Sequence, residues 1–267
     1  SLNSDAGAIT ILANDSVELA VASSVSGNIT VTATTGSVSD VLASEAANLL
    51  GNVITIAAST GIGAAGDIET DAAVLVLTTA TGGIDVHDLG AVQLGDGSGG
   101  ITTTSSGDIS LLVDGAVTTG NTIETQGGNG NIAINGTSTI TTSHQVTANG
   151  SGDVSIVATG LLTANANVAT TSGDITLRGG GVTQGAASQI NAGSGTILID
   201  GDTGPIALSG GLTSTGSGVV VTVRDTNSLA LPNITATSGT AVIGVGNDIT
   251  GAVTQTAGTS ISADTLN

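Results

Sequence analysis

The chain of 267 residues contains no cysteine, no methionine and no aromatic residue. The absence of cysteine excludes a disulfide framework and any thiolate metal site. Because no Phe, Tyr or Trp is available to fill a wide interior, the core has to be thin and built of stacked aliphatic side chains. The same absence removes the flat aromatic platforms on which proteins stack sugar rings.

Basic residues are almost absent as well. Two arginines, Arg178 and Arg224, stand against 21 acidic residues, and the formal net charge is −19. Since nucleic acids and anionic membrane surfaces are bound through Lys and Arg, the composition predicts neither of them as a partner. The longest strongly apolar run, residues 72–77, is too short to span a bilayer, so we expect no membrane insertion.

Glycine is abundant, with 42 residues, and it recurs at a nearly constant spacing. In the regular copies it precedes a polar residue and then a β-branched one. The recurring positions are Gly107, Gly130, Gly152, Gly173, Gly195, Gly218 and Gly239. Subtracting successive positions gives spacings of 23, 22, 21, 22, 23 and 21 residues, and 267 divided by 22 is about 12 repeats.

Each repeat contains three short clusters of apolar residues, such as 175–177, 182–184 and 190–192, with the alternation typical of strands. Gly, Asn, Asp and Ser separate the clusters and permit sharp corners. Strands this short gain backbone partners by stacking on copies about 4.8 Å away. The pattern therefore predicts an all-β fold, a right-handed parallel β-helix (β-solenoid) with three strands per coil, about 22 residues per coil and about 12 coils.

We expect one continuous β-helix over residues 1–267, with irregular coils in 1–107 and regular coils in 108–267. A flat β-sandwich is the structural alternative, although its hairpin turns would be irregularly spaced. The repeat runs to both ends without a polar cap, and the sequence does not start with Met. Because exposed strand edges are normally covered or paired, we expect the natural chain to be longer or to stack end to end.

The runs 173–184 and 251–263 resemble repeats of giant secreted bacterial surface proteins of the filamentous-haemagglutinin and autotransporter-passenger type. The resemblance covers 108–267 well and the first hundred residues loosely. It implies a three-faced β-helix shaft that is exported and held at the cell surface. The partners it implies are a host or neighbouring cell surface, a glycan, or further coils of the same chain.

One candidate site follows from the period. Arg178, Asp200 and Arg224 each lie three residues after an expected inward residue, so stacking places them in one column of alternating charge. We expect a structural ladder, with each exposed pair contributing about 0.2–1 kcal/mol. The alternative is an anion or sugar-acid clamp formed by the two arginines.

A second candidate site would bind Ca²⁺. Asp153 and Asp174 follow the repeat glycine in neighbouring coils, where two like charges about 5 Å apart repel by just under about 1 kcal/mol in water. A bound Ca²⁺ would relieve this repulsion, and it is the one cofactor that the sequence suggests. Solvated, turn-forming aspartates are the alternative interpretation.

The two histidines, His87 and His144, are 57 residues apart. Asp85 and Asp88 are the acidic residues nearest to His87 in sequence, and Asp85 and His87 can share a strand face. A metal or catalytic role for His87 is weighed against an ordinary solvated side chain.

The sequence predicts a protein that is not an enzyme. It has no Gly-x-Ser-x-Gly elbow, and without lysine it cannot form a Walker-type phosphate loop. Polysaccharide lyases and hydrolases built on β-helices need clustered carboxylates, often with a basic group, whereas the basic groups here are scattered.

The leading functional hypothesis is a structural or adhesive shaft of a large extracellular bacterial surface protein. The alternatives are the subunit of a filament assembled by end-to-end stacking, and a polysaccharide-binding or polysaccharide-degrading β-helix. Binding to ice or a mineral surface is a further possibility, because a threonine follows an apolar strand residue in several coils. These threonines are Thr118, Thr141, Thr163, Thr183, Thr235 and Thr254.

Overall fold

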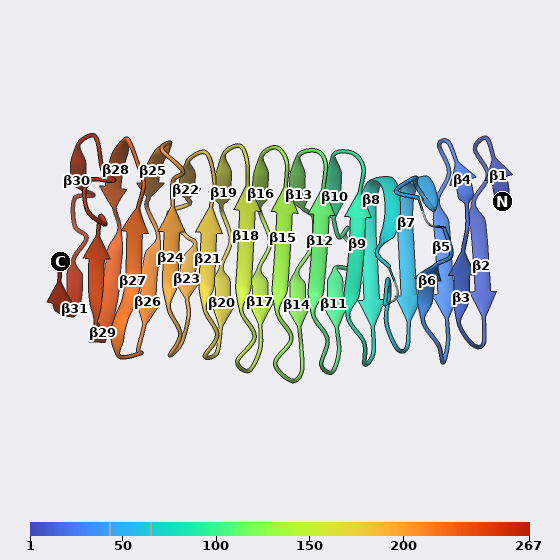
Figure 1. Cartoon of the computed structure of the whole chain (residues 1–267), viewed down its shortest axis with the longest axis horizontal. Coiled ribbons are helices and arrows are strands. Elements are labelled where there is room, and N and C mark those ends of the chain that lie inside the picture. The colour runs from blue at the N-terminus through green and yellow to red at the C-terminus, as the bar shows by residue number, and fades with distance from the viewer. Residues whose placement is uncertain (43, 65) are drawn as a thin grey trace.

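The computed structural model describes residues 1–42, 44–64 and 66–267. They form one rod of stacked parallel strands, with the two termini at opposite ends (Figure 1). The fold is a right-handed β-solenoid of about twelve turns, as the glycine period predicts. Within the described residues no helix is present, and so none has the length and apolar character needed to cross a membrane.

From β9 onward each turn contributes three strands, which stack in register on three faces. The long face consists of β9 (Ile84–Asp88), β12 (Ile109–Val113), β15 (Ile132–Gly136), β18 (Val154–Ala158), β21 (Ile175–Arg178), β24 (Ile197–Asp200) and β27 (Gly218–Arg224). The second face consists of β10 (Val92–Leu94), β13 (Val117–Thr119), β16 (Ile140–Thr142), β19 (Leu162–Ala164), β22 (Val182–Gln184), β25 (Pro205–Leu208), β28 (Ser228–Leu231) and β30 (Val253–Gln255). The third face consists of β11 (Ile101–Thr103), β14 (Ile123–Thr125), β17 (Val146–Ala148), β20 (Val168–Thr170), β23 (Gln189–Asn191) and β26 (Gly211–Ser214).

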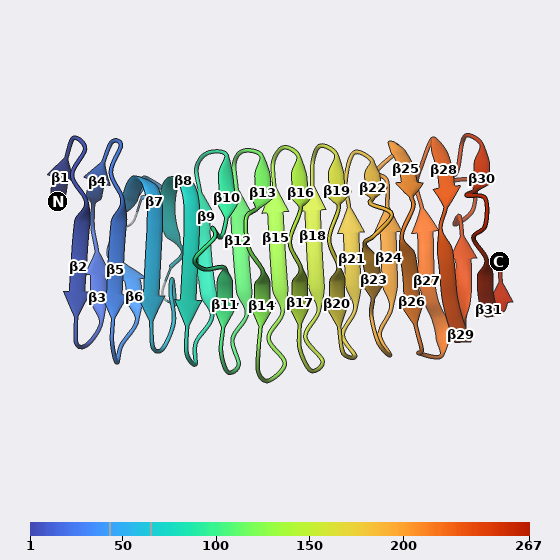
Figure 2. The same cartoon turned by 180° about the vertical axis from the view of Figure 1, so that it is seen from behind.

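Two long strands close the stack, because β29 (Asn233–Ile243) and β31 (Ile261–Leu266) each run from the third face onto the long face. In Figures 1 and 2 the long face crosses the middle of the rod, while the second and third faces lie along its two long edges.

In the first turns the strands begin and end at other positions along the stack than in the later turns. They comprise β1 (Leu2–Ser4), β2 (Ile9–Ala13), β3 (Val17–Leu19), β4 (Ala22–Ser24), β5 (Ile29–Ala33), β6 (Val38–Asp40), β7 (Leu49–Ala58) and β8 (Ile68–Thr79). Strand β7 pairs with β4 and then β5, and β8 pairs with β9 at its start, β10 in its middle and β11 at its end. The corners of the solenoid therefore lie at different positions within the turn before and after β8 and β9. This is why the period is hard to read in the first third of the sequence.

The core is a continuous stack of aliphatic side chains. Strand residues alternate between buried and more exposed positions, as the period of two requires. The first inward column of the long face passes through Ile109, Ile132, Val154, Ile175 and Ile197, each at most 1 % exposed. Since strands are about 4.8 Å apart, twelve turns make a rod about 55 Å long.

The repeat glycines occupy the corner before the long face, where successive turns approach closely. A Cβ added at Gly195 would lie 2.0 Å from the carbonyl oxygen of Gly173, and one at Gly173 would lie 2.0 Å from that of Gly152. The hydroxyl of the buried Thr170 donates a hydrogen bond of 2.6 Å to the Gly173 carbonyl. Steric exclusion by the preceding turn therefore explains the repeat glycines from 107 to 195, whereas Gly218 is favoured by its positive φ of 80°.

Candidate functional site

The aspartates of the candidate Ca²⁺ site lie at one exposed corner in adjacent turns. Asp153 Oδ1 accepts the backbone N–H of Asp174 at 2.7 Å, and Asp174 Oδ1 accepts that of Thr196 at 2.7 Å. The same bond joins Asp108 to Asn131 and Asn131 to Asp153. We call Asp108, Asn131, Asp153, Asp174 and Thr196 the corner ladder. Each of its Asx side chains holds the next turn, which gives these residues a structural role without a cation.

The three residues of the predicted charge ladder occupy one register column, in which Arg178 pairs with Asp200 and Asp200 pairs with Arg224 at the Cα level. Arg224 Nε and Nη2 donate to Asp200 Oδ2 at 3.1 and 2.9 Å. Arg178, however, donates to Asp202 at 3.1 Å. The column therefore contains one ion pair between neighbouring turns, and the second arginine turns to a loop carboxylate.

The different partner of Arg178 has a local cause. Asp200 is 3 % exposed, and its second oxygen accepts the backbone N–H of Asp202 at 3.0 Å. Asp202 takes a left-handed backbone conformation, with φ of 44°, and it forms the ion pair with Arg178. The bond to Asp202 raises the pKa of the Arg178 guanidinium. Both arginines already bind carboxylates of the chain, which leaves neither free to clamp an external anion.

The threonines considered for surface binding form a short column. Thr118, Thr141, Thr163 and Thr183 stack in four consecutive turns of the second face. Two alanines follow in the next two turns before Thr254, and Thr235 lies on the third face. The row of hydroxyl groups is therefore four turns long.

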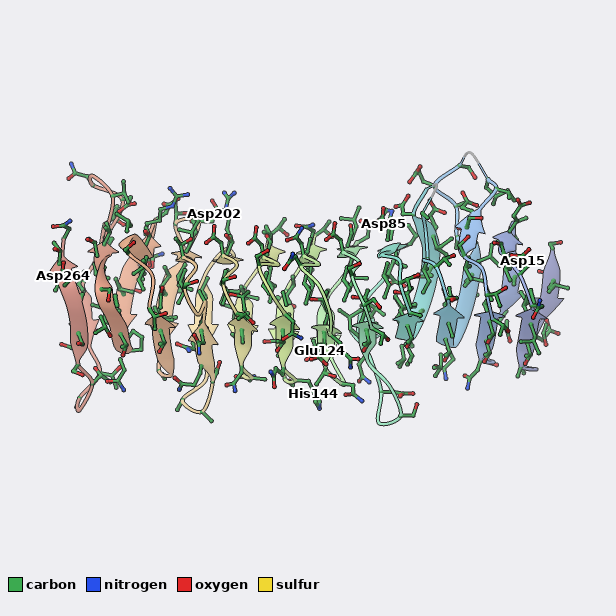
Figure 3. All side chains as sticks on the ribbon, turned by 90° about the horizontal axis from the view of Figure 1, so that it is seen from below. Asp15, Asp85, Glu124, His144, Asp202 and Asp264 are labelled. Atoms are coloured by element: carbon green, nitrogen blue, oxygen red, sulfur yellow. The ribbon has the colours of Figure 1, made fainter. Side chains whose placement is uncertain are left out.

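The two histidines lie in different surroundings. His144 is exposed, and its Nδ1 lies 2.9 Å from the carbonyl oxygen of Thr119. In Figure 3 it lies on the opposite edge of the rod from Asp85, which is on strand β9 together with His87. Asp88, also on β9, points inward and is fully buried. Asp88 is thus directed away from His87, whereas the alternating burial along β9 places Asp85 and His87 on the same outward face.

Asp88 has its own structural partners. Its carboxylate accepts the hydroxyl of Thr70 at 2.7 Å and the backbone N–H groups of Ala72 and Gly90, both at 3.1 Å. Burial raises the pKa of this carboxyl, while these hydrogen bonds act in the opposite direction. Asp88 therefore links the end of β9 to the first residues of β8 by hydrogen bonds, at the turns where the positions of the corners change.

Three metal-ligating side chains converge near β9. One ligand atom each of Glu45, Asp67 and His87 lies within 4.8 Å of the other two, and we call these residues the His87 cluster. Glu45 lies between β6 and β7, and Asp67 directly precedes β8. The two acidic partners were not predicted from the sequence. The repeat period is the sequence feature that could have identified them, because Glu45, Asp67 and His87 are 22 and 20 residues apart, or about one turn each.

Two further carboxylates adjoin this cluster. Asp114 Oδ2 lies 3.2 Å from Nε2 of His87, and this buried nitrogen forms no hydrogen bond within residues 1–42, 44–64 and 66–267. Glu69 is the register neighbour of His87 on β8 and is 2 % exposed. Its Oε2 is buried and has no hydrogen-bond partner in the part of the chain that the structure describes. Burial raises the pKa of the Glu69 carboxyl, and the nearby carboxylates of Asp67, Asp40 and Glu45 raise it further.

An open groove of about 460 Å³ is lined by Val25 and Ser26, which follow β4, and by residues of β7 and β8. Asp71 is the one ionisable residue of its lining. Glycoside hydrolysis requires a pair of carboxylates, so this groove lacks half of that machinery. It does not contain the His87 cluster.

Comparison with known proteins identifies no relative of this chain. No family model matches it, and no curated protein or solved structure matches it significantly.

Proposed function

We propose that the chain is a rigid, non-catalytic shaft segment of a large extracellular bacterial surface protein. The observation that carries the proposal is the uninterrupted aliphatic core, which runs through all turns of a rod with its termini at opposite ends. Such an architecture converts sequence length into distance, at about 4.8 Å per turn. The resemblance of runs 173–184 and 251–263 to repeats of exported adhesins supports the same role.

The backbone pairing supplies the stiffness that a shaft needs. Each internal turn is hydrogen-bonded to the turns before and after it on all three faces. The corner ladder adds side-chain to backbone bonds between the same turns. Bending the rod would break several of these bonds at once, so the elements resist deformation together.

The surface chemistry suits exposure outside a cell. The acidic excess keeps rods apart through like-charge repulsion. Without lysine or aromatic residues, the chain offers trypsin two cleavage sites, both at strand ends, and offers chymotrypsin no aromatic site. The partners proposed for the shaft are a host or neighbouring cell surface, or a glycan on it.

Negative-stain electron microscopy at several protein concentrations tests this proposal, together with assays on acidic polysaccharides. A shaft segment appears as discrete rods about 55 Å long at every concentration and releases no reducing ends from the glycans. Fibres that lengthen with concentration would replace the shaft with the filament hypothesis. Depolymerisation of a glycan would overturn the non-catalytic assignment.

A further inference from the structure

We propose that Glu45, Asp67 and His87 form a binding site for one divalent transition-metal ion of the Zn²⁺ class. This site is independent of the shaft proposal, because it rests on side chains of three consecutive turns and not on the length of the rod. It differs from the Ca²⁺ site expected at Asp153 and Asp174, whose side chains bind backbone N–H groups.

The architecture places the three ligands together. Glu45, Asp67 and His87 are separated by 22 and 20 residues, so each belongs to the next turn of the solenoid. Their ligand atoms lie within 4.8 Å of one another. Ligand atoms around a tetrahedral Zn²⁺ are about 3.4 Å apart, given metal–ligand distances near 2.1 Å. Small side-chain rotations close this difference, and Glu45 is exposed and free to rotate.

An independent observation at the same place is the unpaired carboxylate oxygen Oε2 of Glu69. The residue is 2 % exposed, its Oε2 has no hydrogen-bond partner among the described residues, and it stands beside His87 in register. A buried carboxylate without a partner is normally paired with a cation or neutralised. The nearest basic side chains in the same column, Arg178 and Arg224, bind other carboxylates several turns away. A metal ion bound by the His87 cluster supplies the missing positive charge.

The donor set selects the kind of metal. An imidazole nitrogen combined with carboxylate oxygens suits Zn²⁺ and its first-row neighbours, whereas Ca²⁺ and Mg²⁺ are bound by oxygen donors alone. Asp114 Oδ2 lies 3.2 Å from Nε2 of His87, close enough to orient the ring or to complete the ligand set. Carboxylates that orient a ligating histidine are a regular feature of zinc sites.

The test is a Zn²⁺ titration of the metal-stripped full chain, followed by calorimetry and by NMR of the imidazole rings. Millimolar Mg²⁺ in the buffer occupies non-specific acidic sites. Because the chain has two histidines, their ring signals are readily separated. We expect one saturable equivalent of Zn²⁺ and a shift of the His87 signals while those of His144 stay unchanged.

Single substitutions test which residues bind the Zn²⁺ ion. His87→Ala should weaken Zn²⁺ binding by more than the roughly 10- to 100-fold typical of changes outside the ligand shell. His144→Ala is the matched control and should bind as the native chain does. Asp67→Asn, which preserves side-chain volume, gives a second readout if His87→Ala fails to fold, and circular dichroism reports folding. Unsaturable binding, equal shifts of both histidines, or unchanged affinity in His87→Ala or Asp67→Asn would overturn the proposal.

Discussion

The two arginines of the chain permit a direct comparison between a buried and an exposed ion pair. Arg224→Gln removes both guanidinium hydrogen bonds from Asp200, whose side chain is 4 % exposed. Arg178→Gln removes one hydrogen bond from Asp202, whose side chain is 48 % exposed. The substitutions are chemically identical and lie two turns apart in one column. Any difference in stability therefore reports the burial of the acidic partner.

The structure sets the expected magnitudes. Breaking a fully buried ion pair costs about 3–5 kcal/mol, because the remaining charge stays desolvated. Arg224 is 42 % exposed and Asp200 keeps the backbone N–H of Asp202, so we reduce this figure to about 2–3 kcal/mol. Both partners of the second pair are about half exposed and screened by solvent, so Arg178→Gln should cost clearly less than Arg224→Gln.

Urea denaturation followed by far-ultraviolet circular dichroism measures both variants, since a chain without aromatic residues has no intrinsic fluorescence to follow. Hydrogen exchange over residues 198–225 detects opening confined to the affected turns. Adding Asp200→Asn to Arg224→Gln removes the unpaired charge and should recover most of the loss. Equal destabilisation by the two arginine substitutions, or no recovery in the double variant, would refute the reasoning.

Three further predictions concern the corners and loops. Gly195→Ala should destabilise the rod by about 2–3 kcal/mol in urea denaturation, because its Cβ would lie 2.0 Å from a carbonyl oxygen of the preceding turn; a neutral effect would contradict the close approach. Asp153→Asn keeps the acceptor for the N–H of Asp174 and should change stability by less than about 0.5 kcal/mol, whereas Asp153→Ala should cost about 1 kcal/mol. The hydroxyl and N–H of Ser98 donate hydrogen bonds to Asp96 and lower its pKa. The loop is therefore stabilised above the unfolded pKa of Asp96, and this stabilisation is lost as the pH falls through the folded pKa. Titration of the carboxyl group by NMR would show a normal pKa if these bonds do not form in solution.

The fold was predictable because one steric requirement repeats in the regular turns that begin at glycines 107 to 195. A side chain at Gly173 or Gly195 would collide with the preceding corner, and this exclusion leaves a period visible in the sequence. The first third follows the same solenoid with its corners at other positions. Strands β7 and β8 run through places where later turns bend, so no fixed residue marks the turn.

The candidate sites were predictable in register but not in pairing. The period correctly aligned Arg178, Asp200 and Arg224, yet it could not place the loop residue Asp202 beside Arg178, because that contact depends on left-handed backbone after β24. Along the chain, the acidic residues nearest to His87 are Asp85 and Asp88. In a solenoid the relevant neighbours are one turn away, which is where Asp67 lies.

The register column that contains His87 also contains Arg178, Asp200 and Arg224, and it runs unbroken from β8 to β27. Successive members stand one strand spacing apart, so His87 and Asp200, five steps from each other, are separated by about 24 Å along the axis. The position of a side chain in the column therefore gives its distance from His87 along the rod axis. A paramagnetic ion held at His87 would therefore report axial distance, turn by turn, to any group attached farther along the rod.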